Sequence, residues 1–139
     1  MFACLLSACD RPPEPSEPPR PAAREERPET APSQKQIADR SEQCRQKSSE
    51  EFRRAWKDEP AGTAAFTSHY NARMNTCFYQ LTLDAAGTLR KMLFDLNEGE
   101  LYGEFAGPPE GQPRVCRVIA FYCASGGEWE VLVRPYMES

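Results

Sequence analysis

The spacing of the cysteines constrains the fold of this chain more than any other feature of its sequence. Six cysteines occur among 139 residues, a high count for a short chain. Four of them lie after residue 40, namely Cys44, Cys77, Cys116 and Cys123. They contain no Cys-x-x-Cys pair, and the chain has a single histidine, His69, whereas structural zinc sites use closely spaced ligand pairs. We therefore expect two disulfides formed in an oxidising compartment, and no metal site.

Four cysteines allow three pairings, of which we favour Cys44 with Cys77 and Cys116 with Cys123. The first bridge would join an N-terminal helix to a sheet and close a loop of about thirty residues, a stabilisation of roughly 3 to 4 kcal/mol. The second meets an objection, because the ends of a straight strand from Cys116 to Cys123 lie roughly 23 Å apart. Either that segment folds back on itself, or its two cysteines bond elsewhere.

The first nine residues carry a possible membrane-anchoring signal. Leu6, Ser7, Ala8 and Cys9 resemble the lipobox of bacterial lipoprotein precursors. This resemblance implies that the Cys9 thiol receives a diacylglyceryl group and that Cys9 becomes the acylated amino terminus, which anchors the chain in a membrane. A charged start and most of the apolar stretch of a signal are missing, so we expect residues 1–9 to be a truncated signal remnant. The alternative is a short apolar tail in which Cys9 is an incidental thiol.

Residues 10–34 have the composition of a disordered tether. Proline, glutamate and arginine dominate this stretch, which has no aromatic residue. Prolines fix φ and remove backbone donors, so we expect extended polyproline II conformations that could hold a domain on the order of 70 Å from a membrane. A second interpretation is that Pro18-Pro19-Arg20-Pro21 serves as a ligand for an aromatic-lined groove.

Residues 35–139 are predicted to form one small α+β domain. A helix capped near Ser33 should run to about Lys57, with one thin apolar face. Short segments rich in branched and aromatic residues then predict an antiparallel sheet of four to five strands. They are 66–70, 76–83, 89–96, 100–105 and 115–122. A short C-terminal helix should begin after Ser125, whose spacing to Glu128 is that of a capping box.

Charge and hydropathy limit the partners of the chain. With 21 acidic and 17 basic side chains and a pI near 5.1, the chain lacks the cationic excess that nucleic-acid binding requires. No run of eighteen apolar residues occurs, so we expect membrane contact only through the lipid anchor. The sequence predicts no cofactor.

Three stretches of the predicted domain together resemble a small domain found in bacterial hypothetical proteins, many of them exported. The first is Ser68-His69-Tyr70-Asn71 leading to Asn75-Thr76-Cys77-Phe78; the second is Leu93-Phe94-Asp95 through Glu98-Gly99 to Tyr102-Gly103. The third is Cys123-x-Ser125 leading to Glu128-Trp129 and Arg134-Pro135-Tyr136-Met137. The resemblance covers roughly residues 40 to 138 and implies export, but no activity.

Few residues are candidates for a catalytic, metal-binding or partner-binding site. His69, Tyr70 and Asn71 are candidates for contacting a partner, whereas a catalytic pair of His69 with Cys77 would be abolished by a disulfide at Cys77. The acidic residues between 95 and 104 fail the EF-hand template, since glycine falls at the fifth loop position and not the sixth. We expect no catalytic residue.

The function expected from these features is that of a non-enzymatic lipoprotein of the cell envelope, facing the periplasm. It would bind another envelope protein or act as a structural accessory. Two other classes stay open at this point: a small periplasmic enzyme or thiol-redox protein, and an inhibitor of a cell-wall hydrolase.

Overall fold

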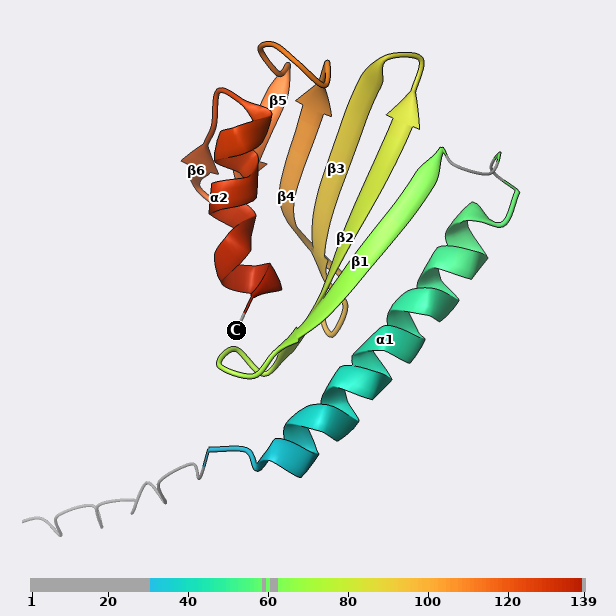
Figure 1. Ribbon diagram of the computed structural model, residues 1–139, viewed down its shortest axis with the longest axis vertical. Helices are drawn as coiled ribbons and strands as arrows, with labels where there is room; N and C mark the ends of the chain where they lie inside the picture. Colours follow the sequence, from blue (N-terminus) through green and yellow to red (C-terminus); the bar gives the residue numbers. More distant parts are fainter. Residues whose placement is uncertain (1–30, 59, 61–62, 139) are drawn as a thin grey trace, which may run out of the picture. The chain divides into compact units, whose positions relative to one another are not determined.

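The computed structural model describes residues 31–58, 60 and 63–138, and these belong to one unit, Ala31–Ser139. Figure 1 shows two helices and one antiparallel sheet, which confirms the predicted α+β class. The lipobox and nearly all of the predicted tether lie outside the described residues. Within the described part, no helix is both long and apolar enough to cross a membrane.

Helix α1 spans Gln34–Trp56 and begins where the sequence predicts. Ser33 accepts a hydrogen bond from the backbone of Gln36, and the Gln36 side chain accepts one from the backbone of Ser33, which is a complete capping box. Cys44 and Ser48 are buried, whereas most other positions of the helix are solvated. Because so little of α1 is apolar, its position depends on the contacts it makes with the sheet.

The sheet is a simple meander in which each strand pairs antiparallel with the next one in the chain. Its six strands are β1 (Ala64–Asn71), β2 (Thr76–Ala85), β3 (Thr88–Asp95), β4 (Glu100–Gly107), β5 (Val115–Val118) and β6 (Phe121–Tyr122). The β2–β3 hairpin turns on Ala86 and Gly87, which both have positive φ (51° and 78°). Positive φ at both central residues is what a type I′ turn requires.

The predicted strand 115–122 is in fact a hairpin, which explains why six strands are found where four to five were expected. The chain reverses at Ile119, whose φ is 53°, so that Val118 pairs with Phe121. The reversal places the Cα atoms of Cys116 and Cys123 5.0 Å apart, and the two cysteines form a disulfide. Of the two alternatives left open by the sequence, the fold-back is therefore confirmed.

Side chains that alternate along the strands build two cores, one on each face of the sheet. Helix α2 (Gly126–Met137) covers the larger core, where Trp129 lies fully buried. Gly103 makes room for it, because a Cβ atom there would lie 3.0 Å from the Trp129 ring. The other members of this core are Phe78, Leu93, Phe105, Cys116, Val118 and Val133.

Helix α1 covers only part of the opposite face. The Cys44–Cys77 disulfide, with a Cα–Cα distance of 5.4 Å, joins α1 to β2 and confirms the favoured pairing. Phe52 packs on Phe66 of β1 with ring centroids 4.8 Å apart. The contacts of α1 are mainly with β1 and β2, so the same face of β3 and β4 is left partly open, and Leu101 there is 44% exposed.

Candidate binding groove beside the first helix

Two adjoining hollows lie between α1 and the partly covered face of the sheet, and Lys47 lines both. We call them together the α1 groove. The cationic end, of about 310 Å³, is lined by Arg40, Gln43, Cys44, Lys47, Tyr70, Asn75, Cys77 and Asn97. The apolar end, of about 590 Å³, is lined by Lys47, Glu51, Arg54, Ala55, Trp56, Tyr79, Leu81, Met92, Phe94, Leu96 and Gly99. Both volumes lie within the range in which proteins bind small ligands.

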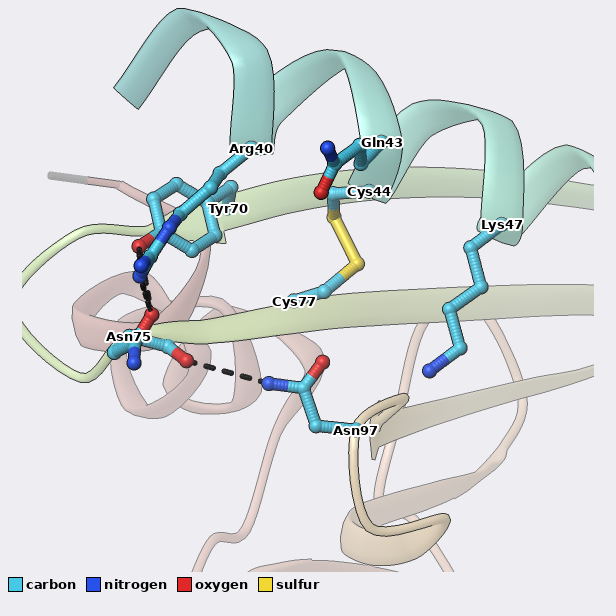
Figure 2. Close-up of a pocket in the computed structure, with 8 residues that line it drawn as sticks. All are labelled: Arg40, Gln43, Cys44, Lys47, Tyr70, Asn75, Cys77 and Asn97. Carbon is cyan, nitrogen blue, oxygen red and sulfur yellow. Dashed lines mark hydrogen bonds between the residues drawn. A yellow bond between two sulfur atoms is a disulfide. The ribbon is translucent and has the colours of Figure 1, made fainter. Parts of the chain in front are cut away.

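Arg40 is held in place at the cationic end by Tyr70 and Asn75 (Figure 2). Its guanidinium donates to the Tyr70 hydroxyl at 3.0 Å and to the Asn75 side-chain oxygen, and it lies 5.9 Å from the centre of the Tyr70 ring. The Tyr70 hydroxyl in turn donates to Asn75 at 2.9 Å. Asn97 donates to the backbone oxygen of Asn75 at 3.2 Å. These contacts order a charged side chain at the surface.

The cationic end carries positive charge that no carboxylate of its lining balances. Arg40 and Lys47 are the two charged residues there, and neither forms an ion pair with any described residue. The Lys47 ammonium donates to the backbone oxygen of Leu96. Two cations lining a concave surface attract an anion more strongly than the same charges on a flat surface, because the low-dielectric walls focus their field.

Between these two cations, the Cys44–Cys77 disulfide forms part of the wall (Figure 2). Ser48, one turn after Cys44, is fully buried and donates to the Cys44 backbone oxygen at 2.8 Å. The bridge fixes α1 relative to β2, so the two cations keep a constant position against the sheet. Because both sulfurs are bonded, Cys77 has no thiolate. It therefore cannot form the catalytic pair with His69 that was considered from the sequence.

The apolar end contains a buried hydroxyl group without a hydrogen bond. Tyr79 is 3% exposed, and its hydroxyl has no partner among the described residues. Burial, with a smaller contribution from the charge of Glu51, raises the pKa of Tyr79 to about 12, so the group stays a donor at all physiological pH values. A buried, unsatisfied hydroxyl costs about 1 to 3 kcal/mol. Buried polar groups without a hydrogen bond are rare in native structures, so this one calls for an explanation.

The floor and rim of the apolar end differ in character. Leu81, Met92 and Phe94 come from β2 and β3, and the Phe94 ring lies 6.2 Å from that of Tyr79. On the rim, Glu51 and Arg54 of α1 form an ion pair. The groove therefore combines an apolar floor with a charged rim, and its uncompensated charge lies toward Arg40 and Lys47.

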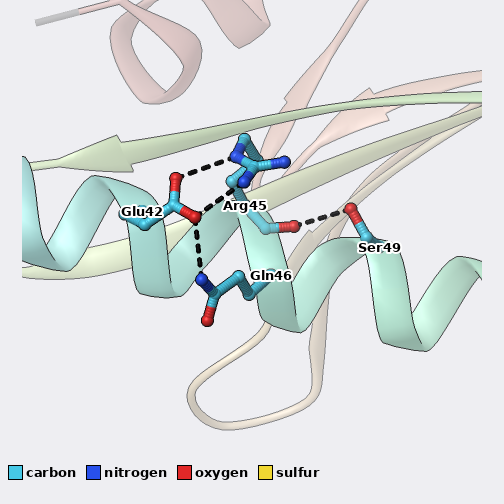
Figure 3. Close-up of polar contacts among 4 residues, drawn as sticks. All are labelled: Glu42, Arg45, Gln46 and Ser49. Carbon is cyan, nitrogen blue, oxygen red and sulfur yellow. Dashed lines mark hydrogen bonds and ion pairs between the residues drawn. The ribbon is translucent and has the colours of Figure 1, made fainter.

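The outward face of α1 has a different role (Figure 3). Glu42 accepts hydrogen bonds from Arg45 at 2.9 and 2.6 Å and from Gln46 at 2.7 Å, and these bonds lower the pKa of Glu42. Ser49 donates to the backbone oxygen of Arg45 at 2.8 Å. Glu42, Arg45 and Gln46 are exposed and Ser49 is half-buried, so the ion pair adds little stability but keeps this face solvated.

The structure separates the three residues that the sequence suggested for partner contact. Tyr70 is buried beneath α1 and belongs to the cationic end. Asn71, fully buried, donates to the backbone oxygens of Pro135 and Tyr136 at 2.9 and 3.3 Å. His69 lies on the α2 face in a third hollow, of about 430 Å³, which Glu138 also lines. The three side chains therefore form no common surface.

The pKa of His69 is lowered by burial, an effect that the charge of Glu138 partly opposes. Cys9, the predicted lipidation site, lies outside the described residues. Among the described residues, no three histidine, cysteine or acidic side chains come together in a way that could hold a metal ion.

Comparison of the chain with protein-family models, with curated proteins and with solved structures finds no match.

Proposed function

We propose that this chain is a non-enzymatic binding module of the bacterial cell envelope, held on a membrane by an acylated Cys9 and facing the periplasm. The observation that carries the proposal is the α1 groove, which places uncompensated cations beside an apolar floor. A concave, mostly apolar site with a few convergent polar groups is the usual form of a binding site. In this role the groove receives one component of the envelope.

Three features support the location. The sequence Leu6-Ser7-Ala8-Cys9 resembles a lipobox, and a proline-rich stretch follows it. The disulfides Cys44–Cys77 and Cys116–Cys123 are of the kind that persists in an oxidising compartment such as the periplasm. A proline-rich spacer would let the anchored domain reach partners away from the bilayer surface.

Location is tested by labelling cells with radioactive palmitate and fractionating their membranes. The chain is expressed with a charged start and an apolar stretch added ahead of Met1 to complete the signal, and we expect label on the wild-type sequence and its recovery with membranes. Cys9→Ser should lose the label and move to the soluble fraction, whereas Cys4→Ser should behave like the wild type. Equal labelling of the wild type and Cys9→Ser would overturn the anchor.

Binding in the groove is tested by placing a photo-crosslinking amino acid at Met92, on the floor of the apolar end. The matched control carries the same amino acid at Gln46, on the exposed outward face of α1. After irradiation of intact cells, we expect a discrete adduct from position 92 that is absent from position 46. Adducts from both positions, or from neither, would contradict a binding role for the groove.

A further inference from the structure

We infer that the α1 groove binds a single-chain amphiphile with an anionic head, a long acyl chain that ends in a carboxylate or a phosphate. This inference rests on the proposed function and names the class of ligand for the same site. The head would lie beside the Lys47 ammonium, with Arg40 contributing at longer range, and it would accept from the Tyr79 hydroxyl after displacing the side chains that close this hydroxyl off from the groove. The chain would lie along the floor formed by Leu81, Met92 and Phe94.

The two ends of the groove match the two parts of such a molecule. Arg40 and Lys47 are seven residues apart on α1, about 10 Å along the helix axis, and neither is neutralised by a described carboxylate. From Lys47 to Trp56 the helix rises a further distance of about 13 Å over the apolar floor. An extended palmityl chain is longer than this, so its first part would lie on the floor and its end would extend beyond Trp56, while an anionic head matches the charge.

Tyr79 supplies the observation that distinguishes a ligand site from an open apolar face. Its hydroxyl is buried, has no hydrogen-bond partner in the part of the chain that the structure describes, and is kept protonated. Tyr79 follows Cys77 by two residues on the same face of β2, about 7 Å from the bridge that connects to α1. A protonated phenol donates to an anion, and a short charge-assisted hydrogen bond of this kind is about twice as strong as one between neutral groups.

Glu51 places a negative charge beside the site, so a substitution there should change the affinity for an anion in the opposite direction to a substitution of Lys47. Its carboxylate lines the apolar end and is paired with Arg54 on the rim. An anionic head near Tyr79 would be repelled by Glu51, whereas a neutral head would not. Removing this charge should therefore strengthen binding of an anion and leave a neutral amphiphile unaffected.

The experiment uses the full-length chain with its disulfides intact and with Cys9→Ser to prevent acylation. Trp56 lines the groove and Trp129 is fully buried in the other core, so the change in tryptophan emission on titration reports occupancy. The probes are palmitate, palmityl phosphate and monopalmitoylglycerol, each below its critical micelle concentration. We expect at least one anionic probe to bind about tenfold or more tightly than neutral monopalmitoylglycerol. The preference between the two anionic probes assigns the head as carboxylate or phosphate.

Three variants test the assigned groups. Lys47→Gln should weaken the anionic probes about tenfold and leave the neutral probe unchanged, and Glu51→Gln should strengthen the anionic probes. Tyr79→Phe should weaken the anionic probes while raising the melting temperature, because it removes an unsatisfied buried hydroxyl. That combination separates a loss of binding from a loss of folding.

Equal affinity for neutral and anionic probes, unchanged affinity in Lys47→Gln, or no saturable signal would overturn this inference. These outcomes differ from failure of the proposed function. If crosslinking at position 92 still yields a specific adduct in cells while the amphiphiles do not bind, the groove is a binding site for another class of ligand. If both assays are negative, the proposed function fails as well.

Discussion

The side-chain amide of Asn71, the last residue of β1, donates to the backbone oxygen of Pro135 in the final turn of α2 at 2.9 Å. The last carbonyls of a helix have no partner within the helix, and Asn71 satisfies two of them. Its own oxygen accepts from the backbone of Met74 at 3.2 Å. One buried side chain thus joins the first strand, the turn that follows it and the C-terminal helix.

Asn71→Ala should therefore destabilise the fold by about 2 to 3 kcal/mol, because it deletes a fully buried side chain that makes three hydrogen bonds to backbone groups. Urea unfolding followed by circular dichroism measures the change in the free energy of unfolding. Asn97→Ala is the matched control, since Asn97 is exposed and should cost less than about 0.5 kcal/mol. Similar losses in the two variants would show that the contact with α2 is unimportant.

Gly103→Ala should cost about 1 to 3 kcal/mol, because the added Cβ atom meets three neighbours at 3.0 Å in a fully packed core. Trp129 and Val118 are two of them, and both are buried. Gly127→Ala provides the opposite case, since a Cβ atom there meets nothing closer than 3.9 Å in α2. It should stabilise the protein by about 0.5 kcal/mol. Thermal unfolding of both variants tests the difference in sign.

Ala86→Gly should stabilise the β2–β3 hairpin by about 1 kcal/mol, since a non-glycine residue pays a steric cost at positive φ. Ala86 is exposed and makes way for glycine without loss of packing. Gly87→Ala, at the next position with φ of 78°, should destabilise by a similar amount. The pair is compared by chemical denaturation, and a loss of stability in Ala86→Gly would contradict the assigned turn.

Removing the two disulfides should have unequal effects. The Cys44–Cys77 bridge spans 33 residues of sequence and Cys116–Cys123 only seven, so chain entropy predicts losses of about 3.7 and about 2.4 kcal/mol respectively. Each pair is replaced by two alanines, and unfolding is followed in denaturant without reductant. A larger loss from the short bridge would mean that effects other than loop closure dominate.

Lowering the pH should decrease the free energy of unfolding, because His69 is harder to protonate in the folded chain than in the unfolded chain. Burial lowers the pKa of His69 below its ordinary value of 6.5, so the unfolded chain binds a proton that the folded chain resists. This penalty is absent above pH 6.5 and grows as the pH falls from 6.5 toward the folded pKa. His69→Gln should therefore lose less stability than the wild type between pH 7 and pH 5. Since this is the only histidine of the chain, the difference between the two pH profiles isolates it.

Several elements could be predicted from the sequence because their signals are local. Cys77, Tyr79 and Leu81 alternate along a segment that the sequence predicts as a strand, and all three are buried on one face of β2. Ser33 and Ser125 cap the two helices at the expected places. The reversal at Ile119 could not be read directly, because Ile119-Ala120 contains none of the residues that usually mark a turn.

The α1 groove could be predicted only in part from the sequence, through the spacing of charged residues along α1. Arg40, Lys47 and Glu51 lie four, three and seven residues from Cys44 respectively, spacings that put them on the same helical stripe and so next to the sheet. Sequence patterns do not tell how far a helix extends over a sheet, since that depends on packing between distant segments. The open floor at Met92 and Phe94 therefore emerged only with the structure.

The two bridges also bear on how the protein reaches its native state. Each cysteine of the folded unit is bonded to the next one along the chain, Cys44 to Cys77 and Cys116 to Cys123. A polypeptide whose first nine residues are held in the membrane, as proposed, presents Cys44 and Cys77 to an oxidising space before the cysteines of the second pair appear. An oxidant that joins cysteines in order of arrival would then suffice, and maturation should need no isomerase to correct mispaired sulfurs.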